Sequence, residues 1–141
     1  MNRKDFLKQL GLSGGAIFAT YCMGGLTACS SNTPTPASNV DFTLDLSLPA
    51  NKALNTNGGY LISNQVVVAR TITGAFVAVT VVCSHEGETK VSYNANANNF
   101  SCSAHGATFD ITGKGTNSNG SKGLKTYQTT LTGTMLRVFS V

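Results

Sequence analysis

Cysteine and histidine are the residues of this chain whose types and spacing could support chemistry. The 141-residue sequence contains four cysteines and two histidines. Each histidine closely follows a cysteine, in Cys-Ser-His at residues 83–85 and in Cys-Ser-Ala-His at residues 102–105. Because both histidines and two of the four cysteines fall into this two-part motif, we expect the four side chains to form one site.

Three kinds of site can use this set of side chains. In an oxidising compartment Cys83 and Cys102 could form a disulfide, which leaves both histidines without a role. Two thiolates and two imidazoles could hold a structural zinc ion, although Cys-x-His in one loop differs from the usual knuckle with two cysteines. In the third kind of site, two thiolates hold one iron of a [2Fe–2S] cluster and two imidazoles hold the other iron. Such a cluster is less negative than one held by four thiolates, so it accepts an electron more readily.

The wider motif points to the third kind of site. Residues 83–87 read Cys-Ser-His-Glu-Gly, and residues 102–110 read Cys-Ser-Ala-His-Gly-Ala-Thr-Phe-Asp. These segments resemble the Rieske motif, which is Cys-x-His followed by Cys-x-x-His-Gly, and the resemblance covers about residues 40–141. It implies a small β-sandwich of stacked antiparallel sheets, with a subdomain of loops that binds a [2Fe–2S] cluster at one end. The implied cluster ligands are Cys83, His85, Cys102 and His105.

Several positions near these ligands differ from the Rieske subunits of cytochrome bc complexes. The ligand loops lack the extra cysteines that form a disulfide beside the cluster there, so the chain resembles the ferredoxin-like branch of the family. Ala107 and Phe109 replace the two hydroxyl residues that bond the cluster and a ligand sulfur. Thr112–Gly123 replaces the Gly-Pro covering loop, and its composition predicts a mobile surface loop. Gly87 and Gly106 would let backbone amides approach the cluster sulfurs closely.

Strands must position these ligands, because the sequence has no helical apolar periodicity. Val40–Leu48 alternates apolar and polar residues without error, which predicts a strand with one face in water. Asn94–Asn99 is polar enough to form a hairpin tip. We therefore predict an all-β domain of roughly seven to nine short strands. The other segments predicted as strands are Tyr60–Ser63, Gln65–Arg70, Gly74–Val82, Lys125–Leu131 and Met135–Val141.

The first 28 residues have the features of a targeting segment. A basic stretch precedes a weakly apolar run that glycines interrupt, which makes a poor transmembrane anchor. Leu-Thr-Ala-Cys at residues 26–29 resembles the lipobox of bacterial lipoproteins and implies a lipid-modified Cys29 at the start of the mature chain. The alternative is an ordinary signal peptide with a chance cysteine. Residues 29–39 then predict a flexible tether, and Arg3-Lys4 resembles the arginine pair of a twin-arginine export signal.

Charge and length narrow the function. Much of the net charge of +4 lies in the first residues, and seven basic against five acidic residues leave +2 from residue 29 onward. This is too small for a nucleic-acid footprint. We predict an extracytoplasmic, membrane-tethered one-electron carrier rather than a stand-alone enzyme, with a cytochrome or a catalytic oxidoreductase subunit as its redox partner. The alternatives are the Rieske subunit of a larger quinol-oxidising or arsenite-oxidase-like complex and a zinc-binding structural protein.

Overall fold

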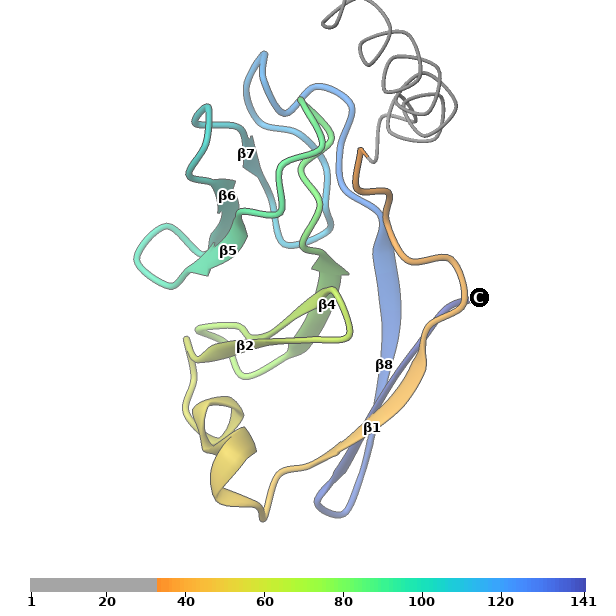
Figure 1. The fold of residues 1–141 in the computed structure, drawn as a ribbon. Helices are drawn as coiled ribbons and strands as arrows, with labels where there is room; N and C mark the ends of the chain where they lie inside the picture. The colour runs from red at the N-terminus through yellow and green to blue at the C-terminus, as the bar shows by residue number, and fades with distance from the viewer. Residues whose placement is uncertain (1–32) are drawn as a thin grey trace, which may run out of the picture. The chain divides into compact units, whose positions relative to one another are not determined.

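The computed structural model describes residues 33–141, which form nine strands and one short 3₁₀ helix (Figure 1). The predicted signal peptide, Cys29 and the first residues of the predicted tether lie outside the described residues. No helix in this described part is long and apolar enough to cross a membrane. In chain order the elements are β1 (Asp41–Asp45), η1 (Pro49–Asn55), β2 (Tyr60–Ser63), β3 (Val66–Arg70), β4 (Phe76–Thr80), β5 (Val91–Asn94), β6 (Asn99–Cys102), β7 (Thr108–Phe109), β8 (Thr126–Thr132) and β9 (Met135–Phe139).

The strands form two sheets in which every pairing is antiparallel. The larger sheet has the order β1-β9-β8-β4-β3-β2, and the smaller has the order β5-β6-β7. Strand β8 divides its pairing, because Thr126 and Tyr127 pair with β4 whereas residues 128–132 pair with β9. This division curls the larger sheet. The predicted all-β class with antiparallel sheets is confirmed.

The hairpin of β3 and β4 lies between two apolar cores. Successive side chains of a strand point to opposite faces. Val66 and Val68 of β3 accordingly pack into one core, and Val67 and Ala69 pack into the other. All four side chains are buried, which explains why β3 is a continuous apolar run and not an alternating one. The second core also contains both cysteines of the motif.

The strand predicted over Val40–Leu48 is shorter in the structure. It ends at Asp45, whose Oδ1 accepts hydrogen bonds from the Ser47 amide at 2.9 Å and from the Ser47 hydroxyl at 2.7 Å. Those bonds favour a turn over continued pairing, and they leave Leu48 exposed. Pro49 then begins η1, since a proline at the first helical position loses no hydrogen bond. The sequence analysis missed this short helix.

Candidate metal centre

The four predicted ligands lie in two neighbouring loops. Cys83 and His85 lie in the loop between β4 and β5, and Cys102 ends β6, just before the turn that carries His105. Val91 of β5 pairs with Cys102 in the antiparallel register. The segment between the two halves of the motif is therefore mostly a hairpin, and its tip lies within the predicted Asn94–Asn99. The hairpin folds the second half of the motif back beside the first.

The two ligand loops share one hydrogen-bond pattern. In each loop the cysteine N–H donates to the carbonyl five residues later, and the glycine N–H donates back to the cysteine carbonyl. Each glycine has a positive φ, a conformation that residues with a Cβ rarely adopt. The structure thus gives both glycines a role in closing a turn, while their predicted approach to cluster sulfurs stays a prediction. The bonds are Cys83 N to Glu88 O at 2.7 Å, Gly87 N to Cys83 O at 2.9 Å, Cys102 N to Ala107 O at 2.9 Å and Gly106 N to Cys102 O at 3.0 Å.

Both cysteines of the motif are buried free thiols. Cys83 is 2% exposed and Cys102 is 1% exposed, and neither forms a disulfide. Burial raises the pKa of the Cys83 thiol, and the neighbouring Cys102 thiol raises this pKa further. Two thiolates side by side in an apolar core need a positive partner. A bound metal centre would supply that charge.

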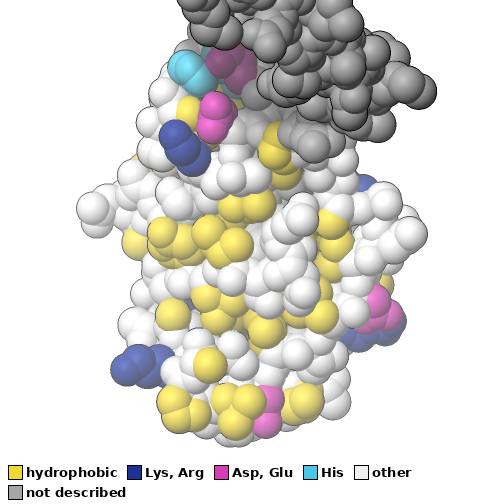
Figure 2. Space-filling view, in the orientation of Figure 1, with side chains coloured by type: hydrophobic (Ala, Val, Ile, Leu, Met, Phe, Trp, Pro, Cys, Tyr) yellow, Lys and Arg dark blue, Asp and Glu magenta, His cyan; other side chains and the backbone are white. Residues whose placement is uncertain are grey.

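The two histidines face a common space at the edge of the site. Their ring centroids are 5.2 Å apart and their planes make an angle of 65°. His85 Nδ1 is buried and has no hydrogen-bond partner among the described residues. Such an orphaned buried nitrogen suits a metal ligand, because burial without a partner is otherwise costly. The side chain of His105 is 41% exposed, and Figure 2 shows histidine and acidic side chains together at this end of the visible face.

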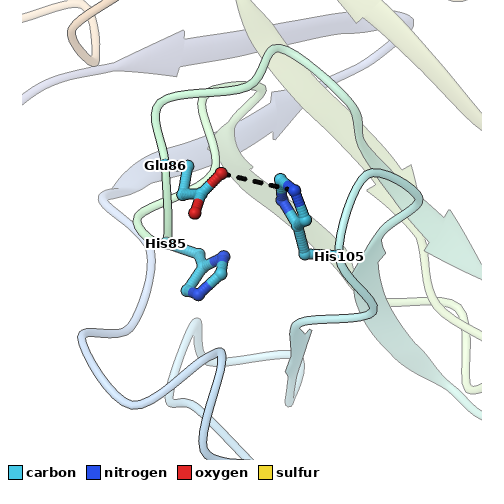
Figure 3. Close-up of side chains that lie close together, drawn as sticks. All are labelled: His85, Glu86 and His105. Atoms are coloured by element: carbon cyan, nitrogen blue, oxygen red, sulfur yellow. Dashed lines mark ion pairs between the residues drawn. The ribbon is translucent and has the colours of Figure 1, made fainter.

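Glu86 adds a carboxylate to this space. Its Oε2 lies 3.3 Å from Nε2 of His105 (Figure 3). One ligand atom each from His85, Glu86 and His105 lie within 4.8 Å of one another. The sequence analysis did not predict this contact, because a residue next to one ligand gives no sign that it reaches the other.

The geometry separates the alternatives for the site. The free thiols do not support the disulfide. A tetrahedral zinc ion requires ligand atoms within about 4 Å of one another, given bonds of about 2.0–2.3 Å. Neither cysteine belongs to any described group of three or more possible ligands within 4.8 Å. Two buried thiols that do not join the close group of His85, Glu86 and His105 fit a centre with two irons better than one small ion.

Ala107 and Phe109 lie deep beside the second ligand loop. Both are 0% exposed and belong to the same core as Cys83 and Cys102. Phe109 ends β7 and pairs with Phe100 of β6. Their apolar side chains fill this core without adding a hydroxyl that could bond the cluster or a ligand sulfur.

The loop Thr112–Gly123 differs from the sequence-based expectation of a mobile segment. Thr116 N donates to Thr108 O at 2.9 Å, and Leu124 N donates to Gly113 O at 2.7 Å, so the loop is held against β7 and closed at its base. The side chains of Asn117 and Asn119 also reach the second ligand loop. The sequence analysis missed both asparagines, because a segment rich in Gly, Ser and Asn carries no apolar pattern that would indicate order.

Comparisons with known proteins agree with this geometry. A model of the Rieske [2Fe-2S] domain family matches residues 44–128. No curated protein sequence matches the chain. Among solved structures, the plasma membrane Rieske protein PetC3 from the cyanobacterium Synechocystis PCC 6803 is 27% identical, with a TM-score of 0.51 over 74% of this chain and 100% of that chain.

Two oxygenase components are also similar in fold. The ferredoxin of carbazole 1,9a-dioxygenase from Nocardioides aromaticivorans is 19% identical, with a TM-score of 0.54 over 74% of this chain and 100% of that chain. A naphthalene 1,2-dioxygenase with indole bound in its active site is 23% identical, with a TM-score of 0.51 over 76% of this chain and 27% of that chain. The fold described here thus occurs both as a small separate protein and as one part of a larger enzyme.

Proposed function

The chain belongs to the Rieske [2Fe-2S] domain family, and we therefore propose that it is a membrane-tethered, extracytoplasmic one-electron carrier. A bound [2Fe–2S] cluster supplies the ability to accept and release a single electron. The observation that carries the proposal is the pair of buried free thiols beside two histidines, one of which has a buried nitrogen without a partner among the described residues. The proposed ligands are Cys83, His85, Cys102 and His105.

The chain's own residues set up the transfer. The core around Cys83 and Cys102 excludes water from the thiolate side of the site. The imidazole of His105 is partly exposed and offers a route from the site to a partner. Glu86 contacts this exposed edge, and Glu88 and Lys90 follow Glu86 in the same loop as an ion pair; the side chains of all three are about half exposed. We propose that a redox protein, a cytochrome or a catalytic oxidoreductase subunit, docks here.

The proposed lipid anchor would keep the domain near a membrane. The support is the lipobox-like Leu-Thr-Ala-Cys that ends at Cys29. The hydroxyl of Tyr127 donates to the Ala37 carbonyl at 2.8 Å, and that of Ser140 donates to the Ser38 carbonyl at 2.9 Å. The chain is therefore bound to the domain from Ala37 onward. The eight Cα–Cα steps from Cys29 to Ala37 span at most about 29 Å when the chain is fully extended.

The end of the domain at which the N-terminal segment attaches indicates where a partner would lie. Pro34 and Pro36 line one hollow together with Cys83 and Gly87 of the first ligand loop. In Figure 1 the first described residues, in orange, lie at the end of the molecule that carries the ligand loops. A lipid on Cys29 would therefore hold the cluster end toward the membrane. This favours a partner that is embedded in the membrane or bound to its surface.

Metal analysis tests the electron-carrier proposal. The purified mature protein should contain two irons and two labile sulfides, and the reduced protein should give a rhombic paramagnetic signal with a mean g below 2. His105→Ala should lose the cluster or one iron, because one imidazole cannot replace two. Zinc without sulfide in protein matured with ample iron would refute the proposal.

A separate experiment tests the anchor. Mass spectrometry of the membrane fraction should show an acylated Cys29 at the N-terminus of the mature chain. Cys29→Ser should release the protein from the membrane while its iron content stays the same. Membrane-bound, mature Cys29→Ser protein would contradict the anchor without affecting the cluster.

A further inference from the structure

The loop Thr112–Gly123 contacts the backbone of the turn that carries His105. Asn119 Nδ2 donates a hydrogen bond to the His105 carbonyl at 2.7 Å. Asn117 Nδ2 donates to the carbonyl of Gly106 at 2.8 Å. These bonds join residues 14 and 11 positions apart in the sequence. Two consecutive carbonyls of the second ligand loop are therefore held by side chains of one other loop.

Asn117 ties this contact to the rest of the domain. Its Oδ1 accepts hydrogen bonds from the Thr108 amide at 3.1 Å and from the Gly120 amide at 2.9 Å. A carboxamide offers two donors and one oxygen acceptor with two lone pairs. Asn117 thus uses one side chain to join the ligand turn, β7 and its own loop.

Two glycines keep the loop close enough for these bonds. A Cβ on Gly120 would lie 2.4 Å from the Thr108 carbonyl oxygen, and a Cβ on Gly115 would lie 1.9 Å from the Gly120 carbonyl oxygen. Real Cβ atoms do not come this close to other atoms. The loop therefore has the backbone contacts of a packed element, and the asparagines are held in place.

Apart from the two backbone hydrogen bonds that close it, the ligand turn has few contacts at His105 and Gly106. Gly106 has a φ of +70°, and a Cβ built there would meet no atom within 4 Å. His105 and Gly106 are themselves exposed, so apolar packing does not hold these two residues directly. Among the described residues, no side chain donates to a backbone carbonyl of residues 83–90 in the first ligand loop. The restraint from asparagine side chains is specific to the second loop.

We infer that Asn117 and Asn119 are positioning residues that hold His105 in place as a metal ligand. This inference rests on the proposed cluster. Without the two bonds, the turn that carries His105 would open more often, and the imidazole would leave the metal more readily. One net hydrogen bond corresponds to about a five-fold change in such an opening equilibrium.

The test uses cluster-loaded protein and three variants. Asn119→Ala removes the side chain that donates to the His105 carbonyl. Asn117→Asp keeps an acceptor for Thr108 but replaces the donor that faces Gly106. Asn96→Ala is the matched control, because this exposed asparagine lies in the hairpin tip and its side chain makes no hydrogen bond among the described residues.

Cluster release to an iron chelator is the first measurement. We expect release to be about five-fold faster in Asn119→Ala and at least as fast in Asn117→Asp, and unchanged in Asn96→Ala. The paramagnetic g values and the reduction potential should shift in the first two variants, since the orientation of one imidazole changes. A loop with a purely structural role would lower the melting temperature of these variants and leave the g values and the potential unmoved.

The outcomes separate this inference from the cluster assignment. Wild-type protein without iron and sulfide would refute the proposed function itself. Wild-type protein with a cluster, together with asparagine variants that match Asn96→Ala in release, g values and potential, would overturn the positioning role alone. Should Asn117→Asp fail to fold, Asn119→Ala still decides the question, because its side chain makes only the bond to His105 among the described residues.

Discussion

Replacing Glu86 by glutamine should raise the reduction potential of the cluster. The carboxylate Oε2 of Glu86 lies 3.3 Å from Nε2 of His105, which is the exposed edge of a proposed ligand. An electron added to the cluster is a negative charge, so a nearby carboxylate disfavours reduction. Glutamine keeps the size of the side chain and removes this charge, and the reduced state should then become easier to reach.

The size of the shift follows from Coulomb's law. Across the imidazole ring, the carboxylate and the added electron are about 8 Å apart, which corresponds to about 2 kcal/mol at an effective dielectric constant of about 20 and about 0.5 kcal/mol in bulk water. For one electron this range is roughly 20–90 mV, since about 59 mV equals a tenfold change in the equilibrium constant. The side chains of Glu86 and His105 are 57% and 41% exposed. Solvent screening therefore favours the lower part of the range, about 20–45 mV.

Protein-film voltammetry at low and high salt measures this shift. Glu88→Gln is the matched control, because it removes the same charge from a carboxylate that lies 3.9 Å from Lys90 Nζ and is thus already partly balanced. The shift in Glu86→Gln should be the larger one and should shrink as salt is added. Equal shifts in the two variants would refute the reasoning. Loss of iron from Glu86→Gln would show that this carboxylate is itself a ligand.

Three further predictions concern residues around the second ligand loop. The wild-type reduction potential should lie in the lower half of the Rieske span of about −150 to +300 mV. Ala107→Ser and Phe109→Tyr should each raise it by some tens of millivolts, because an added hydroxyl stabilises the more negative reduced cluster. A wild-type potential near the top of that span, unmoved by both changes, would contradict this. Gly120→Ala should lower the free energy of unfolding by about 1–3 kcal/mol, as at other overpacked sites. Denaturant titration measures this change. An unchanged free energy would show that the loop shifts to accommodate the added methyl group. The pKa of Asp110 is held below its ordinary value, mainly by the hydrogen bond from the Thr112 hydroxyl. The backbone amides of Lys114 and Thr112 and the charge of Lys114 lower it further. A carboxyl whose pKa is lower in the folded state stabilises the fold at pH values above its unfolded-state pKa. Asp110→Asn should therefore lower the free energy of unfolding at pH 7, and the difference in free energy from wild type should narrow below about pH 4. A difference that does not change with pH would contradict this.

Much of the site was predictable because its signal is chemical and local. Cysteine and histidine in one two-part motif, through the resemblance of that motif to the Rieske pattern, predicted a [2Fe–2S] centre, and the family match agrees. The period-two pattern near Val40 and the apolar run Gln65–Arg70 predicted strands, since a strand's two faces meet different surroundings. The glycine that follows each ligand pair was noticed as well, but its role in closing two similar turns became clear only from the hydrogen bonds.

Tertiary structure alone decided which side chains meet across the loops. The contact of Glu86 with His105 depends on the hairpin of β5 and β6, which brings the two ligand loops together. The order of Thr112–Gly123 depends on amide side chains that bind carbonyls in another loop. Composition predicted mobility there because small polar residues bury little apolar surface. Their order comes instead from directional hydrogen bonds between segments distant in sequence, and no local pattern encodes those partners.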